Sequence, residues 1–362
     1  MLQAQIQNFS YQKCWRNVLE EFNFENVNDL SSKCLINFGG KTLALSKWVS
    51  PKRTRSYPYA RVYDTFDNPK TNKVVTIIPI IKDEGLSGDM DYLQWDTISL
   101  MSLLNVYVIL GFYDYAEVHP TRKNKITKQK FNNNYIVKQL TNLISYHQSA
   151  LHWNLNQLEN KNLSALVEIA KNSYKKIEDS LNVKLHNTQN IDKFAQKISE
   201  DRKTFMEFSR QKAQQAQNRE SLTIQPKEQI GIGQKAKITI SNYLGGQYFF
   251  TIDDVLFKNG ILYLCESKHT KSSLLPSSDD IKDGLLKLML YNNLSSIAGY
   301  KKFKIILRLT SNLLRDSFSL PNNNVDSILA HHDFSNTQIS ILKALNIESQ
   351  NNHFEVWINY EQ

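Results

Sequence analysis

Cysteine is scarce in this chain of 362 residues, which contains only Cys14, Cys34 and Cys265. An odd number of widely spaced cysteines argues against a disulfide framework, and their spacing fits no zinc ribbon. The sequence therefore predicts a protein of a reducing compartment, and we expect it in the cytoplasm.

Long apolar runs are missing as well. No stretch approaches the roughly 18 consecutive apolar residues of a transmembrane helix. The first residues, MLQAQIQNFSYQKCWRN, lack the apolar core of a secretory signal. We therefore expect a soluble protein that has no membrane partner.

Several enzyme signatures are also absent. The segment GIGQKAKIT at 231–239 has the wrong spacing for a phosphate-binding loop of the form G-x-x-x-x-G-K-[ST]. Neither G-x-S-x-G nor H-E-x-x-H occurs, and no dinucleotide-binding glycine pattern follows a predicted strand. ATP-driven restriction or helicase activity is therefore not expected of this chain.

What the chain does have is an excess of positive charge. Lysine and arginine number 44 against 35 acidic residues, which gives a net charge of +9. This balance favours a polyanionic partner, although it does not separate DNA from RNA or from an acidic protein. A hydrophobic content of 41% is sufficient for buried cores.

The most informative segment is YFFTIDDVLFKNGILYLCESKHTK at 248–271, where two apolar runs flank an Asn-Gly pair. Asn-Gly is the preferred sequence of a type I′ turn, because both central residues of that turn need φ > 0. We therefore predict a β-hairpin with Asn259 and Gly260 as its two-residue loop. Lys258 would then lie opposite Ile261.

Counting outward from this turn places Asp253 opposite Glu266. Side chains alternate between the two faces of a strand, so Asp253, Glu266 and Lys268 share one face while Ser267 points away. A three-residue turn would shift the register by one and bring Asp254 to that face instead of Asp253.

Two carboxylates and one ammonium group at the end of a strand pair suit metal-assisted hydrolysis of a phosphodiester. Carboxylate oxygens bind Mg²⁺, and the lysine supplies a further positive charge. The alternative is a salt-bridged strand end without catalytic function. The apolar run 261–265 favours the first interpretation, because a buried strand that ends in charged residues places them at a sheet edge or cleft.

This segment resembles the PD-(D/E)xK nuclease superfamily, in which an acid lies on one strand of a hairpin and (D/E)-x-K on the next. The match consists of Ile252-Asp253, or Asp254, followed by Glu266-Ser267-Lys268, with isoleucine in place of the frequent proline. A predicted helix at 276–294 and a strand at 302–310 complete the superfamily order strand, strand, helix, strand.

The resemblance implies that Asp253 and Glu266 hold Mg²⁺ and that Lys268 assists the attacking water. Members often add a glutamate from the helix that precedes the hairpin. Glu220 is the nearest candidate here, with Glu228 second.

The resemblance also implies which residues contact the nucleic acid and what kind of nucleic acid is the substrate. In the helix after the motif, Lys282 and Lys287 would contact the phosphate backbone, unless they are ordinary surface lysines. The layout looks most like a type II restriction endonuclease, which implies duplex DNA as substrate and a homodimer. There are two alternatives. One is a repair or defence nuclease that acts on structured or single-stranded nucleic acid. The other is a nucleic-acid-binding module without catalytic activity.

Residues 1–119 are interpreted as an α/β domain, with strands between 35 and 118 and a helix at 95–104. The segment 51–61 interleaves tyrosines with cations, a mixture suited to phosphates and nucleotides, or else forms a solvated loop. Its four cations are Lys52, Arg53, Arg55 and Arg61.

A cluster of acids follows in the same domain. It comprises Asp83, Glu84, Asp89, Asp91 and Asp96. A second metal site is one interpretation. A polar loop leading to a helix that starts near Asp96 is favoured, because neither EF-hand spacing nor a histidine partner is present.

The remaining segments complete the predicted division. Residues 1–35 are expected to be helical or irregular, and 119–131 to be a linker or a loop that contacts the nucleic-acid backbone. Residues 120–220 form a helical region, and 221–362 a nuclease core on a mixed sheet. The sequence thus predicts an α/β protein and a Mg²⁺-dependent DNA endonuclease, whose recognition sequence and cut position it does not specify.

Overall fold

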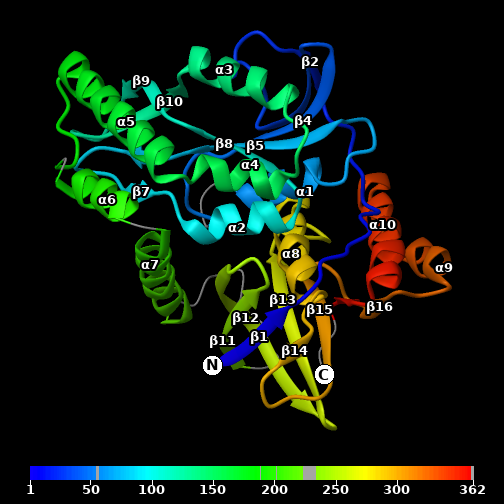
Figure 1. Cartoon of the computed structure of the whole chain (residues 1–362). Helices are drawn as coiled ribbons and strands as arrows, with labels where there is room; N and C mark the ends of the chain where they lie inside the picture. The colour runs from blue at the N-terminus through cyan, green and yellow to red at the C-terminus, as the bar shows by residue number, and fades with distance from the viewer. Residues whose placement is uncertain (54–56, 188, 201, 223–233, 360–362) are drawn as a thin grey trace. The chain divides into compact units, whose positions relative to one another are not determined.

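The computed structural model describes residues 1–53, 57–187, 189–200, 202–222 and 234–359 (Figure 1). It is a mixed α/β protein, as predicted. The chain divides into two compact units: unit 1 comprises Met1–Val18 and Ala213–Gln362, and unit 2 comprises Leu19–Lys212. These limits differ from the three predicted segments, because most of the helical region packs with the N-terminal strands.

Unit 2 contains a five-stranded mixed sheet in the order β2-β3-β4-β5-β8. Only the β3–β4 pair is antiparallel among its four strand pairings. Strands β5 and β8 are formed largely by buried apolar residues, which is typical of parallel strands covered on both faces. The strands are β2 (Glu21–Asn23), β3 (Lys33–Phe38), β4 (Lys41–Lys47), β5 (Lys73–Pro79) and β8 (Tyr107–Gly111).

Two short antiparallel pairs accompany this sheet: β6 (Ile81–Asp83) with β7 (Met90–Tyr92), and β9 (Tyr113–Val118) with β10 (Ile126–Phe131). The predicted linker at 119–131 is therefore wrong in its second half. There the pattern of alternating burial in ITKQKF is that of a half-buried strand.

The helices of unit 2 confirm the helical region and the predicted helix at 95–104. Asn132 and Ser149 cap two of them by accepting the backbone N–H groups of Tyr135 and His152. The helices are α1 (Pro58–Thr65), α2 (Trp95–Leu103), α3 (Asn133–Ile144), α4 (Ala150–Gln157), α5 (Asn160–Leu181), α6 (Gln189–Glu200) and α7 (Arg202–Leu222), the last of which continues into unit 1.

Unit 1 is built on an eight-stranded mixed sheet in the order β14-β1-β11-β12-β13-β15-β17-β16. Its strands are β1 (Leu2–Ile6), β11 (Gln234–Asn242), β12 (Gln247–Lys258), β13 (Ile261–Thr270), β14 (Ser296–Ile297), β15 (Phe303–Ser311), β16 (Phe318–Leu320) and β17 (Glu355–Ile358). The parallel strands β13, β15 and β17 are joined by crossovers that contain α8 (Ser278–Tyr291), α9 (Val325–Ala330) and α10 (Asn336–Asn352).

The predicted hairpin is confirmed. Asn259 and Gly260 both have positive φ, 52° and 75°, and Lys258 pairs with Ile261 across the turn. The predicted order of strand, strand, helix and strand also appears as β12, β13, α8 and β15. Strand β13, most of whose residues are buried, lies in the interior of the sheet between β12 and β15.

The N-terminal residues differ from prediction. Leu2–Ile6 form β1, which pairs with β11 in parallel, rather than a helix or an irregular segment. The chain after β1 is held by Glu348 of α10. Its carboxylate accepts the Tyr11 hydroxyl at 2.7 Å and the backbone N–H groups of Cys14 and Trp15 at 2.8 and 2.7 Å.

Along the described residues, no helix combines the length and the apolar content that crossing a bilayer requires.

Glu348→Ala should destabilise unit 1, because three donors lose a charged acceptor and Glu348 is fully buried. We expect the free energy of unfolding to fall by roughly 3 kcal/mol or more. Urea denaturation followed by tryptophan fluorescence measures this. Lys343→Ala, which removes an exposed ion pair between Lys343 of α10 and Asp326 of α9, is the control and should change stability by less than about 1 kcal/mol. An equal loss in both variants would contradict the anchoring role.

Candidate active site

The site is centred on the carboxylate of Glu266, which lies in the middle of β13 and is fully buried. Its Oε1 atom is 3.0 Å from Nζ of Lys268 and 2.8 Å from Nζ of Lys287 on α8. Lys268 also approaches Oδ2 of Asp283 at 3.5 Å. Two ammonium groups therefore compensate one buried negative charge, which would otherwise be costly to bury.

Asp253 reaches this cluster from the neighbouring strand. Its Oδ2 accepts the backbone N–H of Ser267 at 2.9 Å. The charges that act on it are those of Glu266, Lys287 and Lys268. The predicted association of Asp253, Glu266 and Lys268 is thus present in the geometry, whereas their catalytic role stays a prediction.

A register shift in β12 helps to position the two aspartates. Ile252 pairs with Ala236 and Val255 with Gln234, so Asp253 and Asp254 together face the single residue Lys235. This is the arrangement of a β-bulge, which introduces one extra residue and redirects side chains. The two adjacent carboxylates consequently join different networks.

The side chain of Asp254 lies on the face of the sheet opposite to Glu266 and Lys268. It pairs with Cys265 in the register, accepts the Ser267 hydroxyl at 3.1 Å and lies 3.7 Å from Nη1 of the buried Arg308. Of the two residues that the sequence left open, Asp253 interacts with the group around Glu266.

Helix α8 brings Lys287 and Asp283 to the site. A Cβ atom on Gly284 would lie 3.3 Å from Cε of Lys268 and 3.4 Å from Cγ of Glu266. Glycine at this position therefore allows α8 to pack closely against β13. The helix begins with Ser277 as its N-cap, whose hydroxyl accepts the backbone N–H of Asp280 at 3.2 Å.

The two carboxyl groups have opposite pKa shifts. Burial, together with the charge of Glu266, raises the pKa of Asp253 to about 7. Burial also acts to raise the pKa of Glu266, but Lys287 and Lys268 outweigh it and hold that pKa below its usual value. Burial acts to lower the pKa of Lys268, but Glu266 and Asp283 raise it overall. A charged Glu266 thus lies beside an Asp253 that exchanges its proton near neutral pH.

The donor set fits a small divalent cation. The Oε2 atom of Glu266 is buried and has no hydrogen-bond partner. The repulsion between Asp253 and Glu266 would be relieved by a bound cation. Mg²⁺ commonly keeps several waters and takes one or two carboxylates from the protein, so two would suffice. Within the described part of the chain, no group of three or more His, Cys, Asp or Glu side chains forms a larger metal cluster.

Three further predicted residues have different outcomes. Lys282 is only 1% exposed, and its ammonium lies 4.8 Å from the ring centroid of Trp15, so the structure gives no support to a phosphate contact there. Glu220 belongs to α7, but its side chain lies outside the described residues, as does all of Glu228.

The predicted DNA-contacting cations are in unit 2. Lys52 forms an ion pair with Asp91, and Arg61 donates to the backbone carbonyl of Lys47 at 2.6 Å. Both groups therefore have partners within unit 2. Arg53 is partly exposed, and Arg55 lies outside the described residues.

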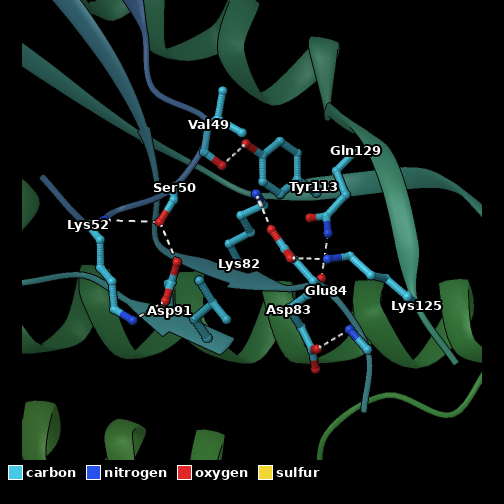
Figure 2. Close-up of polar contacts among 12 residues, drawn as sticks. Val49, Ser50, Lys52, Lys82, Asp83, Glu84, Asp91, Tyr113, Lys125 and Gln129 are labelled. Carbon is cyan, nitrogen blue, oxygen red and sulfur yellow. Dashed lines mark hydrogen bonds and ion pairs between the residues drawn. The ribbon is translucent and has the colours of Figure 1, made fainter. Parts of the chain in front are cut away.

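The acid cluster of unit 2 is divided among separate partners (Figure 2). Glu84 lies between Lys82 and Lys125 at 2.7 and 3.0 Å, and these lysines bring its pKa down to about 2 against the opposing effect of burial. Asp91 accepts the Ser50 hydroxyl at 2.7 Å.

The other acids of this cluster also favour the interpretation as a polar turn. Asp83 accepts the backbone N–H of Gly85 and contacts Nδ1 of His186, both at 2.7 Å. Asp96 lies in the first turn of α2, as predicted. A convergent second metal site would require the carboxylates to share one cation, and here each has its own partners.

The sequence did not identify Lys287 as a partner of Glu266. The sequence suggests a phosphate contact for Lys287 and indicates no role for Asp283. A signal was available, because Asp283 and Lys287 are four residues apart and so lie on one side of the helix that follows the E-x-K strand.

No protein-family model, no curated protein and no solved structure matches this chain. The resemblance to the PD-(D/E)xK superfamily therefore stays a prediction from the hairpin motif.

Asp253→Asn should stabilise the protein above pH 7 in the absence of divalent cations. The folded-state pKa of Asp253 is raised to about 7 from an ordinary 3.8, so its contribution to stability is complete below 3.8 and is lost as pH rises through 7. Asparagine cannot ionise and avoids this loss. We expect a gain on the order of 2–4 kcal/mol above pH 7 that vanishes below 3.8, measured by urea denaturation in EDTA.

Asp254→Asn is the matched control for that measurement. It breaks the pair with buried Arg308 on the opposite face, so it should destabilise the protein at neutral pH by roughly 3 kcal/mol. If the two variants showed the reverse behaviour, the assignment of Asp253 to the Glu266 cluster would be wrong.

Proposed function

We propose that this protein is a Mg²⁺-dependent endonuclease that hydrolyses phosphodiester bonds in DNA. The observation that carries the proposal is the buried Glu266 carboxylate, whose Oε1 atom contacts two lysines while its Oε2 atom has no hydrogen-bond partner. A salt bridge with a purely structural role would satisfy both oxygens. Asp253 adds a second carboxylate, whose pKa is raised by burial and by the charge of Glu266.

Asp253 and Glu266 would hold the cation. When bound, Mg²⁺ stabilises negative charge on the scissile phosphate and lowers the pKa of a coordinated water. Lys287 fixes Glu266 through Oε1 and leaves Oε2 available. A carboxylate held in one orientation loses little conformational entropy when it binds a ligand.

Lys268 would orient the attacking water or neutralise the charge that develops on the phosphate. Its ammonium group lies between Glu266 and Asp283 and stays protonated, since its pKa is raised. A preoriented positive charge in a partly buried site stabilises a transition state more than the same charge in water.

The proposed substrate is duplex DNA cut at a specific sequence, as in a type II restriction enzyme. The net charge of +9 supports a polyanionic substrate. A homodimer with twofold symmetry would present two such sites, one for each strand of a palindromic duplex. In this proposal, Lys52, Arg53, Arg55 and Arg61 of unit 2 contribute to DNA contact.

Glu266→Gln and Lys268→Met should each reduce DNA cleavage by about 100-fold or more, because each removes one charge from the site. The measurement is cleavage of long unmethylated duplex DNA with Mg²⁺, analysed on gels. Discrete wild-type fragments would identify sequence-specific cutting. Degradation of single strands alone would favour a repair or defence nuclease.

Glu355→Gln is the matched control, because it neutralises a different acid of the same sheet that also pairs with a lysine, Lys304, at 2.6 Å. It should cleave at the wild-type rate. Thermal melting establishes that all three variants are folded. The nuclease proposal would be abandoned if the folded wild type cut neither duplex nor single strands with any divalent cation.

A further inference from the structure

One end of the unit 1 sheet has an exposed basic and aromatic surface that the candidate active site does not use. We call it the tip surface. It is formed by the β12–β13 turn and by the segment that enters β15, which adjoin in Figure 1. The backbone N–H of Leu262 donates to the carbonyl of Lys302 at 3.0 Å, which fixes the two segments side by side. The tip surface consists of Phe257, Lys258, Tyr300, Lys301 and Lys302.

Its charge is almost entirely positive. Lys258, Lys301 and Lys302 are exposed and form no ion pair within the described part of the chain. Lys304, the next cation along β15, is paired with Glu355 at 2.6 Å. Three uncompensated ammonium groups therefore lie at this end of the sheet, where they attract a polyanion and repel a second copy of the same surface.

The tip surface also exposes an aromatic side chain. Phe257 is 61% exposed, although it packs edge to face against Tyr300 with ring centroids 5.7 Å apart. A large apolar side chain that stays in water among lysines has no evident role in folding. Cations next to an exposed aromatic ring are the combination with which proteins hold phosphates and contact sugars or bases.

We propose that the tip surface binds duplex DNA, with the three lysines on phosphates and Phe257 against the sugars or bases between them. This rests on the proposed function only in taking DNA as the ligand. Glu266 lies five positions along β13 from Ile261, which is roughly 17 Å at the rise of a β-strand. A duplex that spans both sites would thus be held about five base pairs from the bond that is cut.

The test measures binding alone, in EDTA, so that cleavage does not enter. Fluorescence anisotropy with a labelled duplex of about 30 base pairs is followed between about 50 and 200 mM salt. Lys258→Ala, Lys301→Ala and Lys302→Ala are combined in one variant. Loss of three phosphate contacts should reduce the slope of log K against log salt by about 2.7, so that the wild type loses roughly 40-fold more affinity over this range than the variant does.

The control combines Lys161→Ala, Lys175→Ala and Lys176→Ala on α5, which removes the same charge from three other exposed lysines. Its slope should match the wild type. The proposal would be overturned if the two triple variants behaved alike, if only single-stranded DNA binding depended on the tip surface, or if the wild type bound no DNA.

Phe257→Ala should lower duplex affinity by about tenfold and leave the salt slope unchanged, because an aromatic contact releases no counterions. Tyr243→Ala is its control, since Tyr243 is equally exposed, at 60%, before the opposite end of β12. Equal effects of the two would remove Phe257 from the proposal. A wild type that binds in this way but never cleaves would refute the nuclease and leave the tip surface standing.

Discussion

The burial of the Glu266 carboxylate is the constraint on which the candidate site depends. A charged group in the middle of an eight-stranded sheet is stable only when opposite charges accompany it. Lys268 comes from the same strand and Lys287 from the crossover helix, and both contact the same oxygen. The close packing of α8 through Gly284 is thus linked to the charge that it compensates. The second oxygen of Glu266 remains free of hydrogen bonds, which is the basis of the proposed metal site.

The bulge at Asp253 and Asp254 explains how two adjacent acids have different partners. In a regular strand, neighbouring side chains simply alternate between faces. Here the extra residue disturbs the pairing with β11 while the pairing of Asp254 with Cys265 on β13 is kept. Asp253 consequently interacts with Glu266 and its lysines, and Asp254 with Ser267 and Arg308. Burial, together with the like charge of Glu266, raises the pKa of Asp253, whereas Asp254 lies near the buried cation of Arg308.

The candidate active site and the tip surface, both proposed to contact DNA, differ in how their positive charges are paired and exposed. At the candidate active site, cations are paired with acids and are largely buried, so they contribute little to long-range attraction. At the tip surface, the lysines are exposed and uncompensated within the described residues. The first arrangement suits the stabilisation of charge at one atom, whereas the second suits the capture of an extended polyanion.

Local patterns in the sequence determined the hairpin, the order of strand, strand, helix and strand, and most helices of unit 2. These depend on turn geometry, capping and hydrophobic periodicity, which act over a few residues. Only the tertiary structure decided that Leu2–Ile6 pair with β11, that Lys287 contacts Glu266, and that Lys282 is buried over Trp15. Those contacts join residues far apart in the chain or depend on how a helix is rotated against the sheet. No local preference specifies such a partner, because the free energy that selects it comes from packing and charge compensation in the folded unit.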